Sequence, residues 1–240
     1  MNQRVTWSAQ LIVVLLCALV LKLFYSTASP DELLWILAPT TSLVELLSGR
    51  SFSFESHAGY MSSDHSFLIA ASCAGVNFLI TAFLMLGLKR LWSERQQSLS
   101  WRFIPLAGLF AYVATIIANT VRICIALELQ RHPPNISWLN ANQIHRLEGI
   151  VVYFGFLLLL FFMTEKSYLR RRSSLLQQSL FPLLIYYATT LGIPLANGAF
   201  HRGIEFWQHS LFVLLIPLAL VVTIVLFRSC QITEPPPSLE

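Results

Sequence analysis

The chain has 240 residues, of which 55% are hydrophobic and only 12% are charged, and its mean hydropathy is +0.64. A soluble domain carries about 25% charged residues, so this composition excludes a water-soluble globular domain, and its hydrophobicity excludes a disordered chain. The net charge of +4 is typical of a membrane protein with Lys and Arg in its cytoplasmic loops, and no basic patch with interleaved aromatic residues indicates nucleic-acid binding.

Six apolar segments come close to the roughly 20 residues that a membrane-spanning helix needs. They comprise residues 8–25, 66–88, 104–127, 145–164, 176–193 and 210–227. The fifth is the weakest because it is short and contains Pro182. A further apolar stretch, Leu33 to Leu47, is broken by Pro39 and carries Glu45, so we interpret it as an interfacial or re-entrant piece. The sequence therefore predicts an all-α, polytopic membrane protein with about six transmembrane helices.

The orientation follows from the loops that carry Lys and Arg. Lys and Arg are concentrated in the segments 89–102 and 165–174, and Arg4 and Arg228 flank the first and last spans. Because cytoplasmic loops are enriched in these residues, both termini are predicted to be cytoplasmic. We expect a single transmembrane domain over residues 1–230 and a short, disordered cytoplasmic tail over 231–240.

Three pairs of polar residues lie in or beside apolar spans at positions that topology does not explain. They are Cys73 with Asn77 in the second span, Asn119 with Arg122 in the third, and His145 with Glu148 at the start of the fourth. Each pair is three or four residues apart and so shares a helical face. At 1.5 Å rise per residue, all three pairs are predicted at roughly 10 Å or less from the outer surface.

The residue types are consistent with acyl transfer through a thioester. Cys73 can act as the nucleophile and His145 as its base, while Arg122 supplies a permanent positive charge that also stabilises an oxyanion. Glu148 can pair with Arg122 or orient the imidazole, as the third member of a catalytic triad does. Taken alone, a membrane cysteine is more often a small packing residue, and the neighbouring Gly75 fits close helix packing equally well.

At these residues the chain resembles the exosortase/archaeosortase family of polytopic membrane transpeptidases. The family's three motifs correspond here to Cys73-Ala74-Gly75, to Asn119-Thr120-Val121-Arg122 and to His145-Arg146-Leu147-Glu148-Gly149. The specific likeness covers residues from about 65 to 165, and the short length and the CAGVN variant look like the exosortase K subgroup.

The resemblance implies a cysteine peptidase and transpeptidase in the bacterial inner membrane, with its active site facing the periplasm or exterior. Its substrates would be exported proteins that end in a short motif, a membrane helix and a basic tail. Cys73 would be the nucleophile, Arg122 the transition-state stabiliser and His145 the acid and base, with supporting roles for Asn77, Asn119 and Glu148. No metal and no cofactor are expected.

Two other functions are compatible with the same polar residues. A small transporter or channel could use Arg122, Glu148 and Asn119 along an anion or proton path, although transporter sites usually lie near the midplane. A haem protein would need histidines within facing helices, and only His145 and His209 come near that condition.

Overall fold

The computed structural model describes residues 3–93, 100–133, 140–164, 175–196, 201 and 203–232. Five helices in these ranges are long and apolar enough to cross a membrane, so the chain is a helical membrane-embedded protein. They are α1 (Gln3–Thr27), α3 (Val76–Ser93), α4 (Phe103–Arg131), α5 (Ala141–Met163) and α8 (Ile204–Ile232). The chain divides into two compact units, Met1–Phe161 and Phe162–Glu240.

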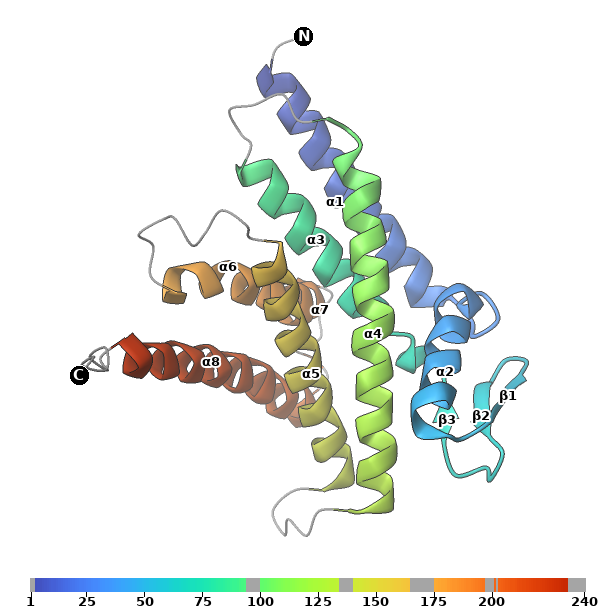
Figure 1. Ribbon diagram of the computed structural model, residues 1–240. Coiled ribbons are helices and arrows are strands. Elements are labelled where there is room, and N and C mark those ends of the chain that lie inside the picture. The colour runs from blue at the N-terminus through green and yellow to red at the C-terminus, as the bar shows by residue number, and fades with distance from the viewer. Residues whose placement is uncertain are drawn as a thin grey trace, which may run out of the picture. The chain divides into compact units, whose positions relative to one another are not determined.

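In the first unit, α3 packs against both α1 and α4 (Figure 1). Gly87 of α3 permits a close approach of α1, since a Cβ atom there would lie 3.1 Å from Cγ1 of Val14. Closer to the N-terminus of α1, the Trp7 indole donates a hydrogen bond to the carbonyl of Leu91. These contacts keep α1 along α3 over several turns.

Helix α2 (Leu34–Ser48) packs beside α4 and is continuous through Pro39, so the expected break at this proline is wrong. Proline lacks an N–H group and leaves the carbonyl four residues earlier without its helical donor. That carbonyl belongs to Trp35, and the Tyr112 hydroxyl of α4 donates to it at 2.7 Å. The two aromatic rings also stack, with centroids 5.8 Å apart. A partner on α4 thus replaces the lost hydrogen bond.

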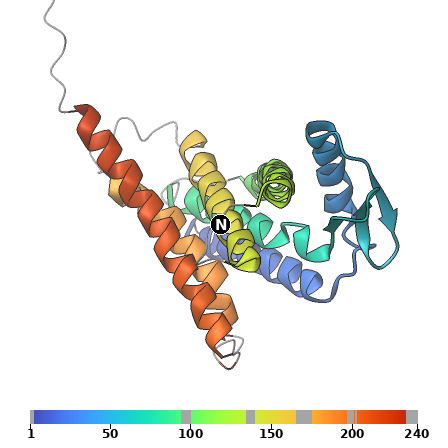
Figure 2. The ribbon, with the colours of Figure 1, turned by 90° about the horizontal axis from the view of Figure 1, so that it is seen from below.

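A three-stranded antiparallel sheet, which the sequence did not predict, follows α2. Its strands are β1 (Phe52–Glu55), β2 (Gly59–Ser62) and β3 (Leu68–Ile69), in that spatial order. The sheet and α2 lie together to one side of α3 and α4 (Figure 2). Gly59 has φ +123°, and a Cβ atom there would lie 2.4 Å from the carbonyl oxygen of Ile69, so only glycine fits. Beyond β3, the short 3₁₀ helix η1 (Ala71–Cys73) leads directly into α3.

The second unit contains α6 (Leu175–Tyr187), a π-helical segment η3 (Ala188–Gly192) and α7 (Ile193–Ala196), followed by α8. The fifth predicted span corresponds to the apolar helix Ser179–Leu195, which is shorter than the five candidate spans. Pro182 lies inside α6 without ending it. The single domain expected over 1–230 stays a prediction, and positions 233–240 of the expected tail lie outside the described residues.

Candidate functional site

Five of the six predicted residues form one cluster in the first unit. Cys73 lies just before α3, Asn119 and Arg122 lie in the last turns of α4, and His145 and Glu148 lie in the first turns of α5. Their contacts connect the three segments. The sixth residue, Asn77, is exposed and is oriented toward α1 instead.

The backbone of Cys73 is held by α4. The buried Asn119 donates from Nδ2 to the carbonyl oxygen of Cys73 at 2.5 Å. Gly75 makes this approach possible because its φ is +73° and because a Cβ atom there would lie 3.2 Å from Cγ of Asn119 and from Cγ2 of Thr115. The glycine of the Cys-Ala-Gly motif therefore has a structural role in turning the chain against α4.

Tyr153 joins the two predicted residues of α4. Its hydroxyl donates to Oδ1 of Asn119 at 2.8 Å and accepts from Nη1 of Arg122 at 3.3 Å. The ring stacks on Phe78 with centroids 5.1 Å apart, which fixes its position between α3 and α5. Sequence reasoning missed this residue, although Tyr153 lies four residues after Gly149 and so shares the motif face of its helix.

Arg122 also contacts His145. Nη2 of Arg122 lies 2.8 Å from Nε2 of His145. A guanidinium only donates, so Nε2 must accept, and the imidazole proton is assigned to Nδ1. Nδ1 in turn lies 3.2 Å from Oε2 of Glu148. Gly149 permits this arrangement because a Cβ atom there would lie 3.3 Å from Nε of Arg122.

Two charged side chains of the cluster keep unused hydrogen-bonding capacity. Both carboxylate oxygens of Glu148 and Nε of Arg122 are buried and have no hydrogen-bond partner among the described residues. The contact of Glu148 with His145 is therefore an ion-pair distance without hydrogen-bond geometry. An unsatisfied buried polar group costs about 1–3 kcal/mol, so the cluster retains groups that a ligand could satisfy.

The described residues of the cluster differ in their exposure. The His145 side chain is 48% exposed, whereas that of Glu148 is 5% exposed. Asn119 is fully buried, and Cys73 is half-buried. A ligand can therefore reach the imidazole and the thiol from the exposed side, while the amide and the carboxylate support the site from within.

No hydrogen bond joins the Cys73 thiol to the His145 imidazole in the described part of the chain. Sγ of Cys73 has no hydrogen-bond partner in the part of the chain that the structure describes, and Nε2 of His145 is occupied by Arg122. Proton transfer from the thiol to the imidazole thus requires the guanidinium to move away from Nε2. The arrangement suits a ligand oxygen that draws Arg122 toward itself.

Helix α1 contributes two residues that the sequence analysis did not single out. The Tyr25 hydroxyl lies 3.4 Å from the carbonyl oxygen of Ala71, and Nζ of Lys22 donates to Oδ1 of Asn77 at 2.8 Å. These contacts lie on either side of Cys73 along the chain. The available signal was a lysine inside an otherwise apolar first span, where topology needs no charge.

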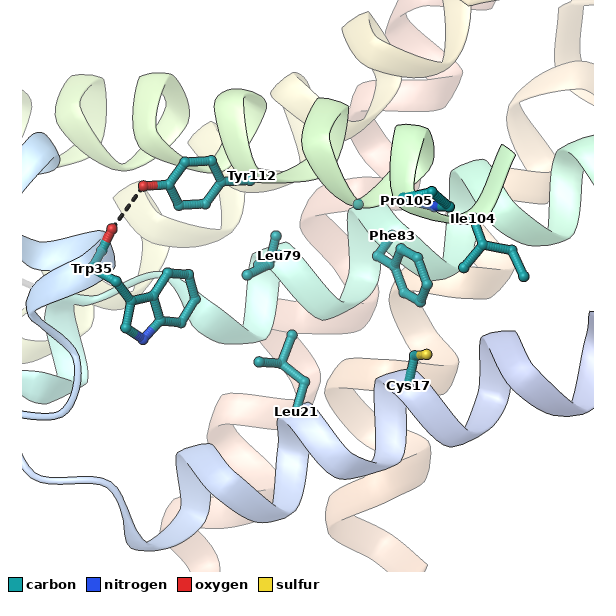
Figure 3. Close-up of a pocket in the computed structure, with 9 residues that line it drawn as sticks. Cys17, Leu21, Trp35, Leu79, Phe83, Ile104, Pro105 and Tyr112 are labelled. Atoms are coloured by element: carbon teal, nitrogen blue, oxygen red, sulfur yellow. Dashed lines mark hydrogen bonds between the residues drawn. The ribbon is translucent and has the colours of Figure 1, made fainter. Parts of the chain in front are cut away.

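A cavity of about 470 Å³ lies elsewhere in the first unit, between α1, α2, α3 and α4 (Figure 3). Its lining is apolar except for Cys17 and for Tyr112, whose hydroxyl is bonded to Trp35. None of the six predicted site residues lines this cavity. Among the described residues, no group of three His, Cys, Asp or Glu side chains could hold a metal ion.

No protein-family model matches the chain, and neither a search of curated proteins nor one of solved structures found a similar protein. The class of the protein therefore follows from its own fold and cluster. It is a helical membrane-embedded protein in which a free cysteine, an arginine and a histidine gather at the junction of three helices.

Proposed function

We propose that the protein is a membrane-embedded cysteine peptidase and transpeptidase. It would cleave the C-terminal sorting signal of an exported protein and transfer the new carboxyl end to an acceptor. The observation that carries this proposal is the continuous chain of contacts from the carbonyl of Cys73 through Asn119, Tyr153 and Arg122 to His145. The likeness of these positions to the exosortase motifs adds to it.

The first half of the reaction forms a thioester. The scissile carbonyl oxygen draws Nη2 of Arg122 from His145, and Nε2 then accepts the thiol proton of Cys73. Sulfur bonds to the carbonyl carbon, and the electron pair moves to oxygen, where Arg122 stabilises the negative charge. When the tetrahedral intermediate collapses, the C–N bond breaks and the imidazolium of His145 protonates the leaving amine.

The second half releases the product. An acceptor nucleophile, either water or an amine, gives a proton to Nε2 of His145 as it attacks the thioester carbon. The C–S bond breaks, and the sulfur takes the proton back from His145. Glu148 stabilises the imidazolium through Nδ1 in both halves, as the carboxylate of a triad does.

The proposed placement has about six spans, cytoplasmic termini and the cluster at the outer face of a bacterial inner membrane. Lys and Arg in the segments 89–102 and 165–174 support this orientation. A substrate held by its own membrane helix would present the peptide bond just outside that helix at the level of Cys73.

The decisive experiment replaces Cys73 with alanine. Cys73→Ala should abolish processing of a co-expressed protein that ends in a motif, a membrane helix and a basic tail, without lowering the level of the enzyme. Cys124→Ala, in α4, is the matched control and should process normally. Unchanged processing by Cys73→Ala would end the proposal. Cys73→Ser tests the alternative function, because a transporter would keep its activity with serine at this position.

A further inference from the structure

Lys22 is a positive charge inside a candidate membrane span, five residues before the end of α1. Its ammonium donates to Oδ1 of Asn77 at 2.8 Å and lies 5.7 Å from the centroid of the Tyr25 ring. No carboxylate of the described residues lies within ion-pair distance of it. An ionisable residue in an apolar helix is costly and is usually paired, so a lysine with only neutral partners needs an explanation.

The position of Lys22 relates it to the reactive cysteine. Asn77 follows Cys73 by four residues and is exposed, so the ammonium is hydrogen-bonded to the first turn of α3, which begins three residues after the cysteine. Tyr25, three residues after Lys22, contacts Ala71 on the other side of Cys73. Helix α1 thus brackets the turn that carries the cysteine, from a different direction than Arg122 on α4.

The pair keeps free hydrogen-bond donors on both side chains. The ammonium has three N–H donors and uses one on Oδ1 of Asn77. The Nδ2 group of Asn77 has no acceptor among the described residues. A positive charge together with free N–H donors matches an oxygen that carries negative charge.

We propose that Lys22 and Asn77 form a binding site for an anionic oxygen group, a carboxylate or a phosphate, on a ligand that lies against Cys73. The inference deepens the proposed function, on which it rests for the identity of that ligand as substrate or acceptor. Arg122 cannot take this role at the same time, because its guanidinium bonds to Tyr153 and His145 without substrate and is proposed to bind the scissile carbonyl oxygen during the reaction.

The test measures the charge preference of Cys73 toward small reagents. A variant with Cys17, Cys124 and Cys230 changed to serine is reconstituted in phosphatidylcholine nanodiscs. The rates of modification by the anionic sulfonatoethyl and the cationic trimethylammonioethyl methanethiosulfonates are compared; each forms a mixed disulfide with the thiolate and releases methanesulfinate. Lys22→Met should lower the anionic-to-cationic rate ratio about five- to tenfold, the effect of one nearby charge in partly hydrated surroundings.

Matched variants separate a local site from general attraction. Lys22→Arg should keep the ratio, and Arg50→Gln, which removes a cation paired with Asp64, should leave it unchanged. A ratio that does not change in Lys22→Met would overturn the site and leave Lys22 as a side chain that only extends toward the membrane surface. If Cys73 reacts with neither reagent, the melting temperature is measured with and without inorganic phosphate. A rise in the protein with Lys22 but not in Lys22→Met supports the site, and no rise in either overturns it.

Two further arms identify the source of the anion. Acetate in solution and phosphatidylglycerol in the nanodisc are each added at constant ionic strength. Slowing of the anionic reagent by acetate points to a carboxylate, and slowing by phosphatidylglycerol points to a lipid phosphate; both effects should be absent in Lys22→Met. Slowing by neither would overturn anion binding. These reactions need no peptide substrate, so their failure leaves the peptidase proposal intact, and the Cys73→Ala processing test remains independent of them.

Discussion

Nη2 of Arg122 lies 2.8 Å from Nε2 of His145, so the nitrogen that would accept the thiol proton is already bonded to a permanent donor. Without a substrate, Nε2 of His145 is therefore not available to accept the thiol proton of Cys73. A substrate carbonyl that attracts Arg122 would release the base and gain an oxyanion donor in the same movement.

Arg122→Lys should slow processing of a substrate that ends in a motif, a membrane helix and a basic tail. We expect a loss of about 100-fold or more, the usual effect of losing an oxyanion donor. A single ammonium cannot contact both the Tyr153 hydroxyl and Nε2 of His145 as the forked guanidinium does. Processing rate and enzyme level are measured together. Arg131→Lys is the control at the exposed end of the same helix, where the side chain pairs with Glu128, and it should retain activity. Retained activity in Arg122→Lys would show that charge alone suffices.

Tyr153→Phe should slow processing about tenfold and lower the free energy of unfolding by about 1–3 kcal/mol. The phenyl ring can still stack on Phe78, but Oδ1 of Asn119 loses its donor and Arg122 loses one anchor. Substrate-saturation kinetics and thermal melting report the two effects. A positioning role predicts a loss in kcat with little change in KM.

Tyr112→Phe is the matched control for that change. It also removes one hydrogen-bonded hydroxyl from an aromatic ring, here the donor to the Trp35 carbonyl, and it lies away from the cluster. It should lower the melting temperature without changing the rate per folded molecule. Equal rate losses in both variants would contradict a specific role for Tyr153.

Gly75→Ala should destabilise the protein and reduce processing. A residue with a side chain at φ +73° is strained by roughly 1–2 kcal/mol, and the new methyl group would press on Asn119 at 3.2 Å. Gly108→Ala is the control, since it has open space for a methyl group and should be neutral or slightly stabilising. Denaturation curves of the two variants decide the point, and equal stability would contradict the close approach of α3 and α4.

Asp31→Asn should loosen the turn between β1 and β2. The backbone N–H of His57 and the hydroxyl of Ser56 donate to the carboxylate and hold the pKa of Asp31 below its ordinary value. Because the pKa is lower in the folded protein, this stabilisation is present above the ordinary carboxyl pKa and is lost as the pH falls through the lowered value. Hydrogen exchange at pH 7 should therefore be faster in the turn of the variant.

Glu32→Gln is the control for this prediction because, among the described residues, the Glu32 carboxylate bonds to Ser29 in its own turn and to no residue of the sheet. It should leave exchange in the strands unchanged. Equal protection in Asp31→Asn and the native protein would show that the sheet does not depend on this carboxylate.

The membrane-embedded class and most of the helices could be predicted from the sequence, because long apolar runs with few charges partition into a bilayer wherever their neighbours lie. That Cys73, Arg122 and His145 would lie in one region of the fold could also be expected from helical spacing and from their depth within the spans. The short helix around Pro182 shows the limit of that reasoning, since length alone separates it from the five candidate spans.

Only the tertiary structure decided which polar groups are hydrogen-bond partners. Tyr112 keeps α2 continuous at Pro39, Asn77 turns to Lys22, and Tyr153 links Asn119 to Arg122. Each of these contacts joins residues that are distant in sequence, so no local spacing specifies it. The composition determined that this chain enters a membrane; which buried polar groups satisfy one another, and which remain free for a ligand, was decided only by how the helices pack.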